Sequence, residues 1–122
     1  RGLGDVYKRQ INNQPSIEPE QLENFILEGF NLIDVREEDE WNAGHHQNAE
    51  HIPMNLITES IDRFKNSEKY IFVCRSGARS GKVTNFILSQ DIEAYNLAGG
   101  MKELQNFSEK IFNLEGNPGQ II

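Results

Sequence analysis

Apolar residues along the chain switch repeatedly between two spacings, and this predicts an alternation of strands and helices. Three apolar runs have the length of buried strands, namely residues 31–35, 70–74 and 94–97, and shorter extended pieces cover residues 16–17 and 50–52. Between these runs, apolar residues recur every three or four positions, as on one helix face; the sets are Leu22, Phe25 and Ile26; Ile57, Ile61 and Phe64; and Val83, Phe86 and Ile87.

Proline and glycine mark where several of these helices should begin or end. Pro19 suits the first position of a helix, and Gly29 suits the position just past its end. A short helix is expected over residues 37–43, with its acidic start favoured by the helix dipole and with Gly44 ending it. The last amphipathic helix is expected to carry a core-facing stripe, formed by Met101, Leu104, Phe107, Ile111 and Leu114.

Strands that alternate with helices over short connections indicate an α/β layer fold with a mainly parallel sheet. Sites in such sheets form beyond the carboxyl ends of the strands. Cys74 closes the clearest strand pattern, residues 70–74, and therefore belongs to this edge. The sequence thus directs attention to the segment that follows Cys74.

Composition narrows the class of protein. The 122 residues are 37% hydrophobic and 25% charged, which suits one compact domain. No apolar run approaches the ~18 residues of a membrane span, so no membrane partner is expected. A net charge of −7 disfavours a nucleic-acid partner, and a single cysteine excludes an internal disulfide framework and a multi-thiolate zinc site. At this size we expect a monomer.

The two ends of the chain are expected to lie outside the domain, which we place at residues 16–115. Residues 1–10 resemble translated adapter sequence and lead into no periodic pattern, so we exclude them from the fold. The natural start of the chain, and any signal peptide, would then be missing. These ten residues carry a net charge of +2, which leaves −9 on the remainder. Residues 116–122 are expected to form a loose tail.

The segment Cys-Arg-Ser-Gly-Ala-Arg-Ser at residues 74–80 carries the candidate chemistry. A chain that curls from strand to helix turns backbone N–H groups inward, and Gly77 permits the dihedral angles that this requires. Arg75, Arg79 and Lys82 place three cations within eight residues of an acidic chain. A thiol at Cys74 should therefore ionise below its free pKa of ~8.5 and act as a nucleophile in an anion-binding pocket.

Two other interpretations of this segment fit its residues less well. Cys74 could be a buried apolar residue at a strand end, as most lone cysteines are, but the flanking loop argues against this. The spacing from Gly77 to Lys82 superficially suggests a nucleotide-binding P-loop. That motif needs four residues between its glycines and Ser or Thr after the lysine, whereas three residues and Val83 are found.

The loop resembles the active-site loop of single-domain rhodaneses, the sulfurtransferase family. Three further stretches match the family's signatures in the right order: Leu-Ile-Asp-Val-Arg at residues 32–36 with Glu40, Trp41, Gly44 and His45; residues 49–53; and Asn-Leu-Ala-Gly-Gly at residues 96–100. The resemblance covers residue 16 to about residue 114. It departs from the family at His46, where isoleucine is usual, and at Leu104, where tryptophan is usual.

The resemblance implies a central, mainly parallel five-stranded sheet flanked by helices on both faces. It also implies that Cys74 is the catalytic nucleophile and carries a persulfide, with no cofactor. The substrate, a small sulfur-containing anion such as thiosulfate, would be bound by the rest of the loop: Arg75, Ser76, Gly77, Ala78, Arg79 and Ser80. The acceptor would be a thiol, another protein or cyanide. The related cell-cycle phosphatases have a loop one residue longer than the six residues from Cys74 to Arg79, so sulfur transfer is favoured.

The roles of individual residues stay partly open at this point. Arg79 could bind the substrate or lock the loop from behind, whereas Arg75 is expected at the pocket mouth. Supporting roles are expected for Asp34, Arg36 and His45. Asp34 could pair with an arginine of the loop or cap the next helix; Arg36 should form a helix-surface pair with Glu40, four residues later; and His45 should hold the turn after the short helix.

Three histidines, His45, His46 and His51, lie close together in the sequence. They lack carboxylate or thiolate partners at ligand spacing, so no metal site is expected. Replacement of isoleucine by His46 should leave its turn more exposed. Trp41 is expected to serve packing.

The leading functional hypothesis is a sulfurtransferase. The alternatives are a non-catalytic rhodanese-like binding or sulfur-carrier module and, with less support, a cysteine phosphatase or arsenate reductase. A lone thiol suits a reducing cytoplasm, so a cytoplasmic location is expected; one cysteine is also compatible with the periplasm.

Overall fold

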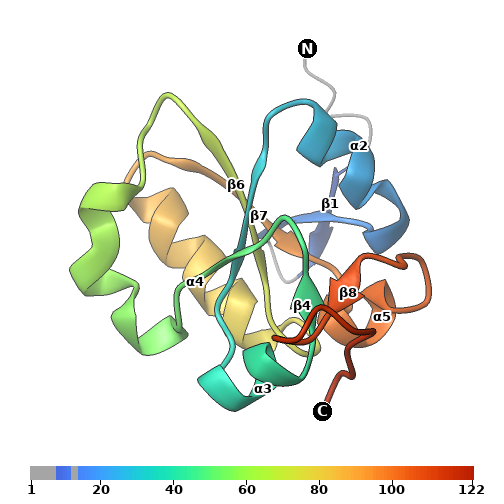
Figure 1. The fold of residues 1–122 in the computed structure, drawn as a ribbon. Helices are drawn as coiled ribbons and strands as arrows, with labels where there is room; N and C mark the ends of the chain where they lie inside the picture. Colours follow the sequence, from blue (N-terminus) through green and yellow to red (C-terminus); the bar gives the residue numbers. More distant parts are fainter. Residues whose placement is uncertain (1–7, 12–13) are drawn as a thin grey trace.

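A parallel sheet forms the centre of the molecule (Figure 1) in the computed structural model, which describes residues 8–11 and 14–122. Its strand order is β1-β2-β7-β6-β3-β5. The strands are β1 (Lys8–Ile11), β2 (Gln14–Ile17), β3 (Asn31–Asp34), β5 (Glu50–His51), β6 (Lys69–Val73) and β7 (Glu93–Leu97). All neighbouring pairs are parallel except β1 with β2. The sequence predicts five of these strands, namely β2, β7, β6, β3 and β5.

Helices cover both faces of this sheet. The α-helices are α2 (Leu22–Leu27), α3 (Glu38–Ala43), α4 (Ala78–Ser89) and α5 (Gly100–Leu104), and the 3₁₀ helices are η1 (Pro19–Gln21), η2 (Met54–Leu56) and η3 (Thr58–Arg63). Figure 1 shows α4 on one side of the sheet and α2 and α5 on the other. A second sheet pairs β4 (His45–His46) with β8 (Ile111–Phe112). The predicted α/β class and layer order are confirmed.

Two cores lie on opposite sides of the sheet, because successive strand residues point to opposite faces. On β6, Ile71 and Val73 join the core beneath α2 and α5, whereas Tyr70 and Phe72 join the core beneath α4. Cys74 continues the second set. The cysteine therefore leaves the sheet on the α4 side, where the next helix begins.

Residues beyond both predicted ends of the domain make backbone hydrogen bonds with it. Of the first ten residues, Lys8–Gln10 are part of β1, which pairs antiparallel with β2, while residues 1–7 lie outside the described residues. The C-terminal segment is also part of the fold. The Gly119 N–H donates to the Ile111 carbonyl (3.0 Å) and the Gln120 N–H donates to the Ala43 carbonyl (2.8 Å). The close crossing with Gly44 requires glycine, because a Cβ there would lie 2.7 Å from the Gln120 backbone.

The predicted last helix is wrong beyond Leu104. Helix α5 ends there, and Phe107 and Leu114 are 53% and 61% exposed rather than buried in a stripe. Ile111 is buried, but as part of β8, which pairs with β4. The helical spacing of these apolar residues is therefore coincidental. Within residues 8–11 and 14–122, no helix combines the length and apolar character needed to cross a bilayer.

Candidate active site

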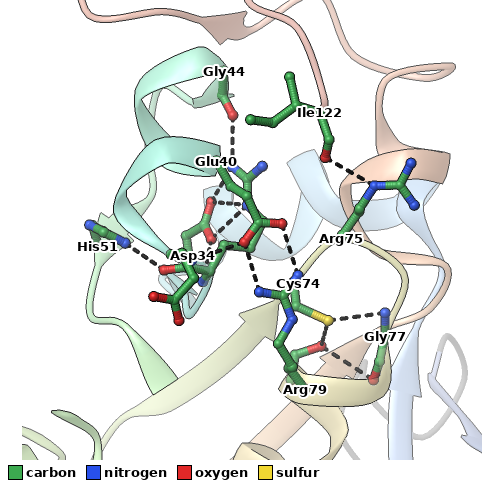
Figure 2. A network of polar contacts seen from close by, with 12 residues as sticks. Asp34, Glu40, Gly44, His51, Cys74, Arg75, Gly77, Arg79 and Ile122 are labelled. Atoms are coloured by element: carbon green, nitrogen blue, oxygen red, sulfur yellow. Dashed lines mark hydrogen bonds and ion pairs between the residues drawn. The ribbon is translucent and has the colours of Figure 1, made fainter. Parts of the chain in front are cut away.

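Cys74 lies at the carboxyl edge of the sheet, directly after β6, and starts the predicted curled loop (Figure 2). The loop enters α4 through Gly77, whose φ of +112° and ψ of −15° lie in the left-handed region. Glycine adopts this conformation without the steric cost that a side chain brings. The turn brings the first N–H groups of α4 around to the sulfur of Cys74.

Hydrogen-bond donors converge on the Cys74 sulfur. The Gly77 N–H donates to Sγ at 3.1 Å, and the hydroxyl oxygen of Ser80 lies 3.2 Å from Sγ. Cys74 is only 1% exposed. Burial raises the pKa of its thiol, but the Ser80 hydroxyl and the backbone N–H groups of Ser80, Gly77 and Ser76 outweigh burial, so the pKa of Cys74 lies below its ordinary value. The arrangement favours the thiolate, the nucleophilic form of cysteine.

Arg79 locks the loop against α3. Its two terminal nitrogens donate to the two carboxylate oxygens of Glu40, at 2.7 and 2.9 Å. The hydrogen bonds to Arg79 lower the pKa of the Glu40 carboxyl, and the same contact raises the pKa of Arg79. Of the two roles considered for Arg79, the structure places its guanidinium in the locking position.

Arg75 points away from this ion pair and lies exposed on the rim of the site. Its Nε donates to the carbonyl of Ile122 at 3.0 Å, as Figure 2 shows. Ser76 and Ala78 are also exposed. A cavity of about 480 Å³ adjoins this part of the loop, and its lining includes Ser76, Gly77, Ala78, Lys82 and Gly99. The loop residues thus divide into a buried group around the sulfur and an exposed group at the rim.

Asp34 and Arg36 pair with each other, which corrects two predictions. Arg36 is fully buried, and its Nε and one terminal nitrogen donate to the Asp34 carboxylate at distances down to 2.7 Å. The same terminal nitrogen donates to the Gly44 carbonyl at 2.7 Å. Asp34 therefore pairs with Arg36 rather than with a loop arginine, and the start of α3 is capped by Glu37 and Glu40 instead. Arg36 does not form a surface pair with Glu40, because it precedes α3 and turns inward.

Two of the three histidines pack on Trp41, and the third lies apart from it, with Glu23. The ring of His45 stacks on Trp41 with centroids 3.6 Å apart, and the His51 ring stacks at 4.7 Å. His45 Nδ1–H donates to the Trp41 carbonyl at 2.7 Å, which holds the turn after α3 as predicted. The prediction for His46 is wrong. The His46 ring is fully buried. Its burial is tolerated because its Nε2–H donates to the Glu23 carboxylate at 2.7 Å.

Sequence reasoning missed residues on β7 and α5 that shape the site. A Cβ on Gly100 would lie 2.5 Å from the carbonyl oxygens of both Cys74 and Arg75, so only glycine allows α5 to approach the loop. The N–H groups of Met101 and Lys102 donate to these same carbonyls. The signal for this contact was the Gly-Gly pair at residues 99–100. Asn96 was also missed: its Oδ1 lies 2.6 Å from the Ser80 hydroxyl.

The sequence matches the rhodanese-like domain family over residues 18–107, which is well over half of the chain. The chain belongs to this family. A rhodanese-like domain is consistent with the α/β layers, and the matched region contains the cysteine loop, the Asp34–Arg36 pair and the Gly-Gly contact.

Relatives and solved structures of this family resemble the chain to different extents. This chain is 40% identical over 70 residues to "Putative sulfurtransferase YtwF" of Bacillus subtilis, and the matched region covers 57% of this chain and 68% of that one. It is 25% identical over 103 residues to thiosulfate sulfurtransferase GlpE of Pseudomonas fluorescens, covering 84% and 94%. The crystal structure of a rhodanese-like domain protein from Staphylococcus aureus superposes with a TM-score of 0.69 at 36% identity, covering 73% of this chain and 89% of that one.

Proposed function

We propose that this rhodanese-like domain is a sulfurtransferase that carries sulfane sulfur as a persulfide on Cys74. One observation carries the proposal: the buried Cys74 sulfur faces the Gly77 N–H and the Ser80 hydroxyl at the carboxyl edge of a parallel sheet. These groups stabilise a thiolate, and N–H groups turned into the same loop would stabilise the terminal sulfur of a persulfide anion. The name of the Pseudomonas fluorescens relative supports thiosulfate as a donor to test.

The proposed reaction has two displacements. In the first, the Cys74 thiolate attacks the outer sulfur of thiosulfate; the S–S bond of thiosulfate breaks and its electron pair leaves with sulfite. In the second, a thiolate or cyanide attacks the outer sulfur of the persulfide; the sulfur–sulfur bond breaks and Cys74 returns as a thiolate. Neither step requires a proton, so a site without a dedicated general acid suffices.

The rim of the loop would bind the anionic donor. Arg75 is exposed there, and its charge is available to an incoming dianion. Arg79 would contribute through the positive potential of the loop rather than by direct contact, because Glu40 occupies both of its terminal nitrogens. The acceptor would be a small thiol or a protein thiol that reaches the same rim. We also propose a cytoplasmic location, because reducing surroundings keep such a thiol reduced.

The decisive variant is Cys74→Ser. Wild type treated with thiosulfate, mercaptopyruvate or glutathione persulfide should gain the mass of one sulfur atom with at least one donor, measured on the intact protein. Cyanide or dithiothreitol should remove it. Cys74→Ser should gain none and should lose thiosulfate:cyanide activity, while its circular dichroism spectrum and melting temperature show that the fold persists.

Three outcomes would contradict this assignment. Sulfur loading that persists in Cys74→Ser would place the chemistry on another group. Absence of loading in wild type with every donor would favour a binding module. Hydrolysis of an aryl phosphate, inhibited by vanadate and lost in Cys74→Ser, would favour a cysteine phosphatase.

A further inference from the structure

Asn96 lies on β7 between two strands and is almost fully buried. It stands opposite Phe72 of β6 and opposite Ser16 of β2 in the parallel register, and only 4% of its surface is exposed. A buried amide must satisfy two donors and an acceptor within the protein. The way in which Asn96 does so determines what it offers to the active site.

The hydrogen bonds of Asn96 fix the orientation of its amide. Its Nδ2 donates to the Gln14 Oε1 at 2.9 Å and to the Gly77 carbonyl at 3.1 Å. Gln14 is held in turn because its Nε2 donates to the Gly81 carbonyl at 3.2 Å. Exchange of the oxygen and nitrogen of Asn96 would set acceptors against acceptors at both contacts. The Oδ1 of Asn96 must therefore face Ser80.

Ser80 has one hydroxyl proton and three acceptors within reach, of which the Gly77 carbonyl, at 3.4 Å, is the most distant. Asn96 Oδ1 lies 2.6 Å from the hydroxyl oxygen, and the Cys74 sulfur lies 3.2 Å from it. An amide oxygen can only accept, so at 2.6 Å it requires the proton. The lone pairs of the Ser80 oxygen then remain to accept from the S–H of a neutral Cys74 thiol.

We propose that Asn96 is a positioning residue: it holds the Ser80 hydroxyl proton while Cys74 is a thiol and releases it to the sulfur when Cys74 is a thiolate. When the thiol proton leaves to solvent, the Ser80 hydroxyl rotates and donates to the sulfur anion. Asn96 Oδ1 is then left facing an oxygen lone pair. The repulsion between these two lone pairs costs free energy and therefore opposes formation of the thiolate. The inference rests on the proposed role of Cys74 as the nucleophile.

Charged groups around Cys74 act on its ionisation independently of Asn96. Arg79 of α4 has a direct electrostatic interaction with Cys74, and Glu40 of α3 pairs with it. Arg75 follows Cys74 in the loop, Lys82 lies one turn further along α4, and the Asp34–Arg36 pair lies at the end of the adjacent β3. These groups remain unchanged in the variants below, so their contribution cancels in each comparison.

The test compares the pH dependence of Cys74 alkylation by iodoacetamide in wild type and Asn96→Ala. Removal of the nearest acceptor leaves only the Gly77 carbonyl, at 3.4 Å, to compete with the sulfur for the Ser80 proton, so the midpoint should move toward acid by about half a unit to one unit. The matched control is Gln14→Leu, which removes the outer partner but leaves the Ser80–Asn96 contact, and its midpoint should stay within about 0.2 units. A midpoint that stays fixed or moves toward base in Asn96→Ala would overturn the inference, as would an equal shift in Gln14→Leu.

A double-variant cycle separates this role from general loosening of the site. Ser80→Ala alone should move the midpoint toward base, and adding Asn96→Ala should cause no further shift. A further acid shift in that background would show that Asn96 acts through another group and would contradict the proposal. If Asn96→Ala does not fold, Asn96→Val, which also removes the acceptor and suits a strand, tests the same sign. Alkylation needs no sulfur donor, so the two tests are independent. Failure of sulfur loading would refute the proposed function, whereas the role of Asn96 is decided by the alkylation midpoints alone.

Discussion

The two halves of the cysteine loop are stabilised in opposite ways. In the first half, the backbone is held: the carbonyls of Cys74 and Arg75 accept hydrogen bonds from the start of α5 at 2.8 and 2.9 Å, while the Arg75 side chain extends to the exposed rim. In the second half, the side chains are held: Arg79 pairs with Glu40 and Ser80 contacts Asn96. The sulfur is therefore enclosed by a hydrogen-bonded frame, whereas the side chains of the rim are exposed to an incoming substrate.

The largest effect is expected where the backbone of the first half is held. Gly100→Ala should destabilise the protein by about 3 kcal/mol or more, because its φ of +63° is unfavourable for alanine and its Cβ would clash with two carbonyl oxygens. Urea denaturation measures this. Gly29→Ala is the matched control: its φ is +95° but no atom lies within 4 Å, so it should lose only about 1 kcal/mol. Equal losses would show that the close approach of α5 is unimportant.

In the second half, the variant Glu40→Gln isolates the charge of the ion pair. Glutamine can still accept from the Glu37 N–H, so the capping box of α3 is kept. We expect a loss of about 1 kcal/mol in unfolding free energy, because a partly buried bidentate pair is replaced by a neutral contact. Glu38→Gln, at an exposed position in the same helical turn, should change stability by less than about 0.5 kcal/mol. An equal change in both would assign the effect to helix charge alone.

The same variant gives a pH dependence with a defined sign. The folded-state pKa of Glu40 is lowered, so its contribution is fully present above the ordinary value of 4.5 and is lost as pH falls through the lowered pKa. The stability difference between wild type and Glu40→Gln should therefore be constant above that value and shrink below it. A difference that grows toward low pH would contradict the assignment.

Much of this frame follows from local sequence pattern, and the rest depends on contacts between distant residues. The strands, α4 and the curled loop were predictable because apolar spacing and Gly77 act locally. His46 was misjudged because its partner Glu23 lies 23 residues earlier in the chain. Arg36 was misjudged because the spacing rule for helices applies only inside a helix, and α3 begins after it. Asn96 could not be linked to Ser80 until β7 was known to lie beside β6.

The smallest effect on stability, but a specific one on activity, is expected at the free rim. Arg75→Ala should change the unfolding free energy by less than about 0.5 kcal/mol, because the side chain is exposed and its Nε donates to the carbonyl of Ile122 near the end of the chain. It should raise the KM for thiosulfate with little change in kcat, since a rim charge binds the donor and the transition state alike. Lys82 is another exposed cation beside the loop, and Lys82→Ala tests whether the loss of any positive charge there raises the KM. Steady-state kinetics at two salt concentrations would separate direct binding from general attraction, because salt screens the second far more than the first. An unchanged KM in Arg75→Ala would show that the donor enters elsewhere, and the free half of the loop would then serve the acceptor instead.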